Sequence, residues 1–135
     1  MYEINFSFEH GAGVFLWCSN PDDEQRWGGN PVDPATLPIS ADLRAELTRL
    51  GEWYNTSLNW AYPPDPGPWR QQECDRFNTA ATTALDRLRT ELCAEWEVIR
   101  NFADQYEDAD LDRYLADPAG FQRRPSPPPT ATTTP

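Results

Sequence analysis

YEINFSFEHGAGVFLWCS, residues 2–19, is the stretch that decides the fold of this chain. Over residues 2–9, aromatic or aliphatic side chains alternate strictly with polar ones, which is the pattern of a half-buried antiparallel strand. Gly11 and Gly13 can adopt positive φ and so allow a tight turn. Residues 14–19 are apolar on both faces, which favours a more central strand. The sequence therefore predicts an N-terminal β-hairpin.

Two helices and a third strand are predicted after the hairpin. Residues 20–38 contain four prolines and a Gly-Gly pair, which predicts a long loop that is either packed down or functional. Ser40 is a favourable N-cap, and leucines spaced by three and four residues predict an amphipathic helix after it. Pro68 fits the first position of a second, longer helix. Residues 96–102 alternate again and predict a third strand.

The expected fold is α+β, a two-layer sandwich with the element order ββααβ. It has an antiparallel sheet of about three strands, with two antiparallel helices on one face. We expect this domain to span residues 1–103. An acidic appendage at 104–122 follows, in which Leu111 and two neighbours can form one face of a short helix. The Pro/Thr-rich tail at 123–135 has no large apolar side chain and is expected to be disordered.

The charge balance restricts the classes of partner. Acidic residues number 22 and basic residues 11, giving a formal net charge of −11. Such a surface repels phosphate backbones and anionic lipids, which disfavours nucleic-acid and membrane binding and favours a basic protein partner. All the basic residues are arginine, which excludes Schiff-base chemistry on lysine. The sequence has neither a bilayer-length apolar run nor a signal peptide, so the expected location is the cytoplasm.

The sequence predicts no catalytic residue, metal ligand or cofactor. In the expected hairpin, His10 lies roughly 13 Å from Cys18, too far for proton transfer. The run Asp108, Asp110, Asp112 imitates the start of a calcium loop but lacks its later glycine and glutamate. No nucleotide-binding or hydrolase motif occurs in the chain.

Residues 57–69, SLNWAYPPDPGPW, concentrate apolar surface in a segment that prolines exclude from a helix or a central strand. One interpretation is a stiff lid that folds over the open end of the core. The other is a loop whose rings also anchor a partner. The candidate partner-binding residues are Trp60, Tyr62, Asp65 and Trp69, and separately Asp108, Asp110 and Asp112.

Three segments, VDPATLPIS, SLNWAYPPDPGPW and ELCAEWEVI, occur in this order and spacing within residues 2–102. In this they resemble a family of small, acidic, lysine-poor actinobacterial proteins of unassigned activity. By size and charge the chain is also similar to immunity proteins, which neutralise secreted toxins. This second resemblance implies a protein that binds and inhibits another protein.

The function favoured by these observations is a non-catalytic, acidic protein-interaction module, an immunity-like inhibitor of a basic partner. One alternative is a polyanion mimic that acts on a nucleic-acid enzyme through acids spaced like phosphates. Another is a small-ligand binder or enzyme with a pocket under the proline-rich loop, where Asn59, Asp65 or Arg70 converge. The outer strands of the sheet could also pair with a second copy to form a homodimer.

Overall fold

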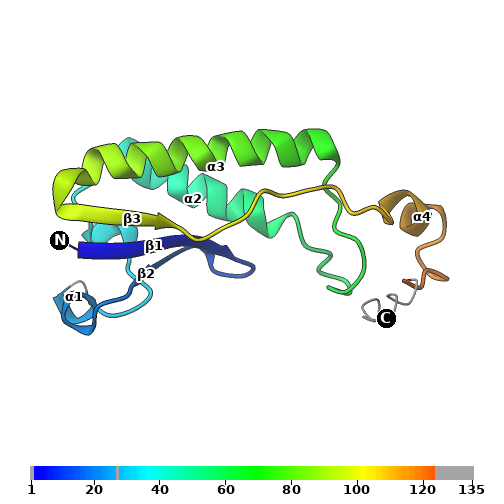
Figure 1. Ribbon diagram of the computed structural model, residues 1–135. Helices are drawn as coiled ribbons and strands as arrows, with labels where there is room; N and C mark the ends of the chain where they lie inside the picture. The colour runs from blue at the N-terminus through cyan, green and yellow to red at the C-terminus, as the bar shows by residue number, and fades with distance from the viewer. Residues whose placement is uncertain (1, 27, 124–135) are drawn as a thin grey trace, which may run out of the picture.

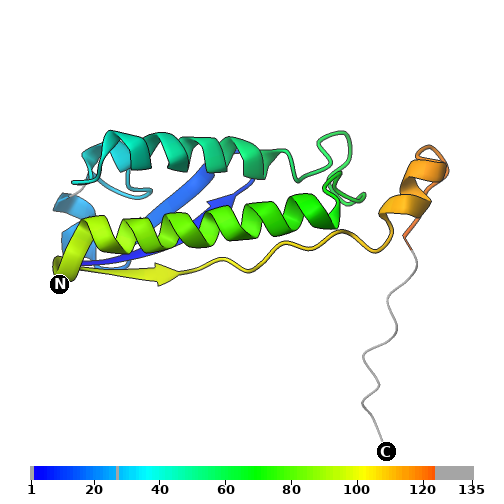
Figure 2. The ribbon, with the colours of Figure 1, turned by 90° about the horizontal axis from the view of Figure 1, so that it is seen from above.

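A computed structural model describes residues 2–26 and 28–123 of the chain. Two long helices, α2 and α3, lie side by side over one face of a three-stranded sheet (Figures 1 and 2). The predicted α+β class and two-layer arrangement are confirmed. The elements, in chain order, are β1 (Tyr2–Glu9), β2 (Gly13–Cys18), α1 (Pro21–Arg26), the 3-10 turn η1 (Pro34–Thr36), α2 (Ala41–Asn55), α3 (Gln71–Leu92), the 3-10 turn η2 (Cys93–Glu95), β3 (Trp96–Arg100) and α4 (Leu111–Ala116).

The sheet is mixed, with the strand order β2-β1-β3, so the prediction of a fully antiparallel sheet is wrong. β1 and β2 form the antiparallel hairpin, but β3 runs parallel to β1, with Tyr2 opposite Trp96. The reason is the path of the chain between β2 and β3. Because α2 and α3 run out and back, the chain returns to the end of the sheet where β1 begins, and β3 must then run in the direction of β1 (Figure 1).

The predicted central position of the second strand is also wrong, because β2 lies at an edge of the sheet. The segment 20–38, predicted as one long loop, contains α1 and η1, and the part of it around Asn30 and Val32 packs against the outer side of β2. Val32 donates its backbone N–H to the carbonyl oxygen of Leu16 at 2.7 Å. The side-chain amide of Asn30 bonds both backbone groups of Cys18, at 2.9 and 3.0 Å. These contacts occupy the outer edge of β2. If β3 had paired at that edge, it would have been antiparallel to its neighbour β2.

The outer edge of β3 is also partly occupied. Arg89 of α3 donates two hydrogen bonds, at 2.9 and 3.1 Å, to the carbonyl oxygen of Val98. Strands at the edge of a sheet pair with other chains through backbone groups that have no partner in their own chain. Pairing of strands with a second copy, which stays a prediction, would therefore have to use the remaining edge positions.

The beginnings of the two long helices differ in how well the sequence predicts them. Ser40 caps α2 as expected, since its hydroxyl oxygen accepts the N–H of Leu43 at 3.1 Å. The expected helix start at Pro68 is wrong, because α3 begins at Gln71. Trp69 is held in the core, and its indole N–H donates to the hydroxyl of Thr56 at 2.8 Å. The helix α3 therefore begins only after Trp69, whose indole ring is packed in the core.

The core lies between the sheet and the two long helices, and Phe77 of α3 is at its centre. Its ring contacts the rings of Phe8 on β1, Trp53 and Tyr54 on α2, and Trp69, at centroid distances of 5.0 to 5.8 Å. These contacts join the sheet, both helices and the proline-rich loop into one unit. Of the helices in the described part of the chain, none has the length and apolar character that spanning a bilayer requires.

Candidate functional site

The proline-rich segment at 57–69, called the proline loop from here on, is folded around the side chain of Asn59. Its amide oxygen accepts the backbone N–H groups of Ala61 and Tyr62, both at 3.1 Å. Its amide nitrogen donates to the carbonyl oxygen of Pro66 at 3.3 Å. At Gly67 the backbone approaches so closely that a Cβ atom would overlap the carbonyl oxygen of Ser57. The loop is therefore a compact unit with a defined shape.

The aromatic residues of the proline loop divide into two groups. Trp69 is only 7% exposed and packs in the core, as the lid interpretation expects. Trp60 and Tyr62 remain 57% and 58% exposed. The indole N–H of Trp60 donates to the carbonyl oxygen of Asn55 at 2.6 Å, which fixes this ring at the end of α2. The loop thus covers the core with one ring and presents two others to solvent.

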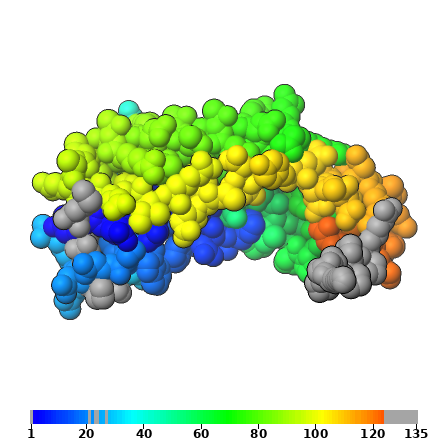
Figure 3. Space-filling view, viewed as in Figure 1, coloured from blue at the N-terminus to red at the C-terminus, as the bar shows by residue number. Residues whose placement is uncertain are grey.

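The acidic segment after β3 is carried along the side of α3 to the proline loop. Asn78 on α3 exchanges two hydrogen bonds with the backbone of Gln105, at 2.7 and 3.0 Å. At the first residue of α3, Gln71 and Glu107 bond each other's backbone N–H groups at 3.0 and 2.9 Å. Figure 3 shows this segment lying along the molecule until it reaches the end where α4 is placed.

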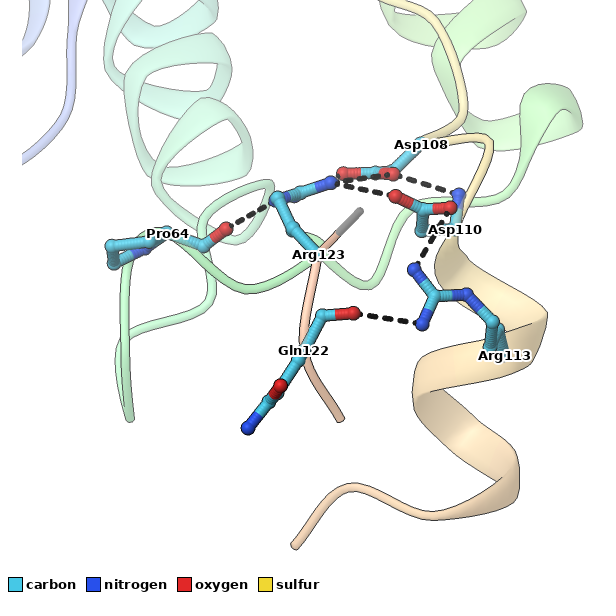
Figure 4. Close-up of polar contacts among 6 residues, drawn as sticks. All are labelled: Pro64, Asp108, Asp110, Arg113, Gln122 and Arg123. Atoms are coloured by element: carbon cyan, nitrogen blue, oxygen red, sulfur yellow. Dashed lines mark hydrogen bonds and ion pairs between the residues drawn. The ribbon is translucent and has the colours of Figure 1, made fainter. Parts of the chain in front are cut away.

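Arg123 joins the acidic segment to the proline loop (Figure 4). Its guanidinium donates to Asp108 at 2.6 Å, to Asp110 at 3.2 Å, and to the carbonyl oxygen of Pro64 at 2.7 Å. We call this arrangement the Arg123 clamp. A second link joins Arg70 to Asp112 at 2.7 Å. The two groups of candidate residues that the sequence could only name separately therefore lie side by side.

These ion pairs change the interpretation of the acidic residues at 108–112. Asp108 and Asp110 are partly buried and share one arginine, so they do not form a free row of negative charges. The side chain of Asp112 is 82% exposed in spite of its ion pair. This segment therefore does not present a row of free carboxylates spaced like the phosphates of a nucleic acid. Arg123 itself falls in the tail predicted to be disordered, and residues 124–135 of that tail lie outside the described residues.

The Arg123 clamp should make stability depend on pH in the acid range. Hydrogen bonding from Arg123 is the main cause that lowers the pKa of Asp108 below its ordinary value. Because the unfolded aspartate binds a proton more readily, the stabilisation is present above about pH 4 and is lost as the pH falls through the folded-state pKa. We expect Arg123→Gln to lower the free energy of unfolding at pH 7, by no more than about 1 kcal/mol since both partners are partly exposed.

Thermal unfolding at pH 7 and at about pH 2 checks this expectation, because the difference between wild type and variant should be smaller at the lower pH, where the aspartates are protonated. Arg76→Gln is a matched control: its ion pair with Glu73, at 3.5 Å, joins two residues within one turn of α3. An equal difference between wild type and Arg123→Gln at both pH values would contradict the ionic explanation.

A cavity of about 190 Å³ lies between the proline loop and the acidic segment, and Trp69, Cys74 and Tyr106 are among its lining residues. Ligand pockets are typically ~300–1,000 Å³. The polar groups expected to converge there do not do so: Asn59 is bonded within its own loop and Arg70 pairs with Asp112. The geometry therefore gives little support to a small-ligand site under the loop.

One polar pair was not predicted from the sequence. His10 and Ser57 are 47 positions apart, yet Nε2 of the histidine lies 2.9 Å from the serine Oγ, and its ring stacks on Tyr54 at 4.3 Å. The hydroxyl of Ser57 donates to the carbonyl oxygen of Tyr54 at 2.6 Å, so the histidine Nε2 must carry the hydrogen and donate. In this arrangement the imidazole cannot accept the serine proton, and the pair does not form an activated nucleophile.

His10 instead connects the hairpin to the proline loop. Its ring also lies edge-on to Trp60, with 6.3 Å between the ring centroids, and the N–H of Gly11 donates to the side chain of Asn55 at 2.8 Å. Partial burial lowers the pKa of His10, which favours the neutral form of the ring. Cys18, the other half of the pair weighed from the sequence, lies opposite Ile4 at the far end of the hairpin.

Comparison with known proteins identifies a family. The family described as "Serratia CdiI immunity protein-like" matches residues 4–105. The matched region contains the sheet except its first residues, both long helices and the proline loop, and it ends before α4. Comparison with curated protein sequences gives no match. The expected resemblance to immunity proteins is confirmed at the level of the family, and we conclude that this chain belongs to the Serratia CdiI immunity protein-like family.

Proposed function

We propose that this chain is a non-catalytic inhibitor that binds a basic toxin protein directly and blocks it. Membership of an immunity protein-like family supports an inhibitory role. The net charge of −11 supports a basic partner, because complementary charge speeds encounter and disfavours wrong partners. The observation that carries the proposal is the pair of exposed rings, Trp60 and Tyr62, held on a rigid loop beside acidic side chains.

The candidate residues take two different roles in this proposal. Trp60, Tyr62, Asp65 and Asp112 are the proposed contacts with the toxin. The other three candidate residues stabilise the proline loop and are not proposed contacts. Trp69 anchors the loop in the core, and Asp108 and Asp110 hold the loop through Arg123. A loop that is already ordered loses less conformational entropy when it binds, so its few rings can contribute more of their contact energy.

The test uses the protein encoded by the gene directly upstream of this one, which the proposal expects to be the toxin. We expect the chain to restore growth when the two are co-expressed, and to bind the purified toxin more weakly as salt concentration rises. The double variant Trp60→Ala with Tyr62→Ala should lose about ten-fold or more in affinity, because exposed aromatic anchors dominate protein interfaces. Isothermal titration calorimetry measures the affinity, and circular dichroism checks that the melting temperature is retained.

Thr83→Ala is the control, since this residue is exposed on α3 and outside the proposed contacts. Failure of the wild-type chain either to protect or to bind would overturn the proposed function. Wild-type affinity in the double variant would leave the function standing but would remove these two rings from the interface.

A further inference from the structure

The face of the sheet turned away from α2 and α3 has no long helix over it (Figure 1). Alternation along the strands brings a mixture of acidic, polar and apolar side chains to this side. We call it the open face, and define it by Glu3, Asn5, Ser7 and Glu9 of β1, Phe15 and Trp17 of β2, and Glu97 and Ile99 of β3.

The open face carries a pair of stacked aromatic rings next to polar side chains that already have hydrogen-bond partners. Phe15 and Trp17 stack with 5.6 Å between centroids and 15° between planes, and Trp17 is 43% exposed. Beside them, Asn5 donates to the hydroxyl of Ser19 at 2.8 Å, and Ser7 donates to the carbonyl oxygen of Phe15 at 3.1 Å. These groups line a hollow of about 320 Å³ that also includes Glu9 and Asn101. Phe15 and Trp17 can receive an apolar side chain at this hollow, whereas the Glu9 carboxylate in its lining requires a cationic group from the same partner.

The charges on the open face are not compensated within the described part of the chain. Glu3 lies directly opposite Glu97 in the register of β1 and β3. Like charges in directly opposed positions on neighbouring strands are destabilising. No ion pair among the described residues involves Glu3, Glu9 or Glu97, in contrast to the aspartates held by Arg70 and Arg123. A cationic group placed between Glu3 and Glu97 would relieve their repulsion.

The open face is also continuous with the exposed rings of the proline loop. Glu9 lines the hollow, and the next residue, His10, contacts Trp60. A stable protein interface engages roughly 20–30 residues on each side, more than the tip of the proline loop and α4 can supply. Through Glu9 and His10, the open face and the exposed rings of the proline loop belong to one aromatic and acidic surface that extends around the tip of the hairpin.

We infer that the open face is a docking surface for a cationic protein, whose apolar side chain enters the hollow beside Trp17 while its arginine or lysine pairs with Glu3 and Glu97. The inference rests on the proposed function, because the occupant is the same basic toxin. A second copy of this chain does not fit, since two open faces would bring glutamates together. Anionic lipid and nucleic acid are repelled by the same three glutamates.

The test measures binding of the same upstream-encoded protein to two variants of the open face. Glu3→Gln with Glu97→Gln removes two charges with little change in shape, and should bind about ten-fold more weakly while its melting temperature is equal or higher. Trp17→Thr keeps a strand-forming residue but removes the ring, and should also bind more weakly. Glu52→Gln with Asp86→Asn is the matched control: it changes the net charge equally at exposed helix positions and should alter affinity less than about two-fold.

The outcomes separate this inference from the proposed function. If the wild-type chain does not bind the toxin, the proposed function fails, and the inference fails with it. If the wild-type chain binds and the open-face variants bind as tightly as it does, the inference alone fails. Equal weakening in the Glu3/Glu97 and Glu52/Asp86 variants would show that only overall charge matters, and would also overturn it.

Discussion

Replacing Phe77 with alanine is expected to cost about 3–5 kcal/mol of the free energy of unfolding. The ring is buried and touches four other aromatic rings from β1, α2 and the proline loop. Alanine would leave a cavity at the point where these elements meet, and each lost aromatic pair contributes about 0.5–1.5 kcal/mol beyond area burial. Because domains of this size are stable by only about 5–15 kcal/mol, the loss is a large part of the total.

Urea denaturation followed by tryptophan fluorescence measures this effect. Phe77→Leu is the control, since leucine keeps much of the buried volume and should cost less than half as much. The alanine variant should also loosen the proline loop, because Trp69 packs on Phe77 at 5.0 Å. A loss below about 1 kcal/mol for Phe77→Ala would mean that the core can repack around the missing ring, contrary to the role assigned to it here.

The Gly51→Ala variant is expected to be less stable by about 1–3 kcal/mol, although alanine is the better helix former by about 0.5–1 kcal/mol. The reason is the direct contact of the hairpin with α2. A Cβ atom on Gly51 would lie 2.9 Å from the backbone nitrogen of Val14 and 3.0 Å from the Cα of Gly13. Both are backbone atoms of β2, so the clash cannot be relieved by rotating a side chain.

The sign of the change in the urea midpoint decides this prediction. Glu52→Ala, one position later on the exposed side of α2, gives the matched comparison and should change stability by no more than about 0.5 kcal/mol. If Gly51→Ala were more stable than wild type, helix propensity would dominate and the close packing of hairpin on helix would be wrong.

The candidate surface could be predicted from the sequence only in part. The composition of residues 57–69 identifies a loop rich in aromatic rings, but local sequence does not tell which ring enters the core. Trp69 is buried because it lies at the start of α3, over Phe77, whereas Trp60 is held outside by Asn55. The link through Arg123 could not be predicted either, because it joins three segments that only the folded chain brings together.

The sequence by itself determined the local elements of this protein: the hairpin, the leucine pattern of α2 with its Ser40 cap, and the α+β class. These depend on interactions between residues a few positions apart, which periodicity and capping record directly. Only the tertiary structure decided that β3 runs parallel to β1, and that many of the acids after β3 are compensated while those on the open face are not. These outcomes depend on which strand edge was already occupied and on which arginine lies within reach, and both are set by long-range packing.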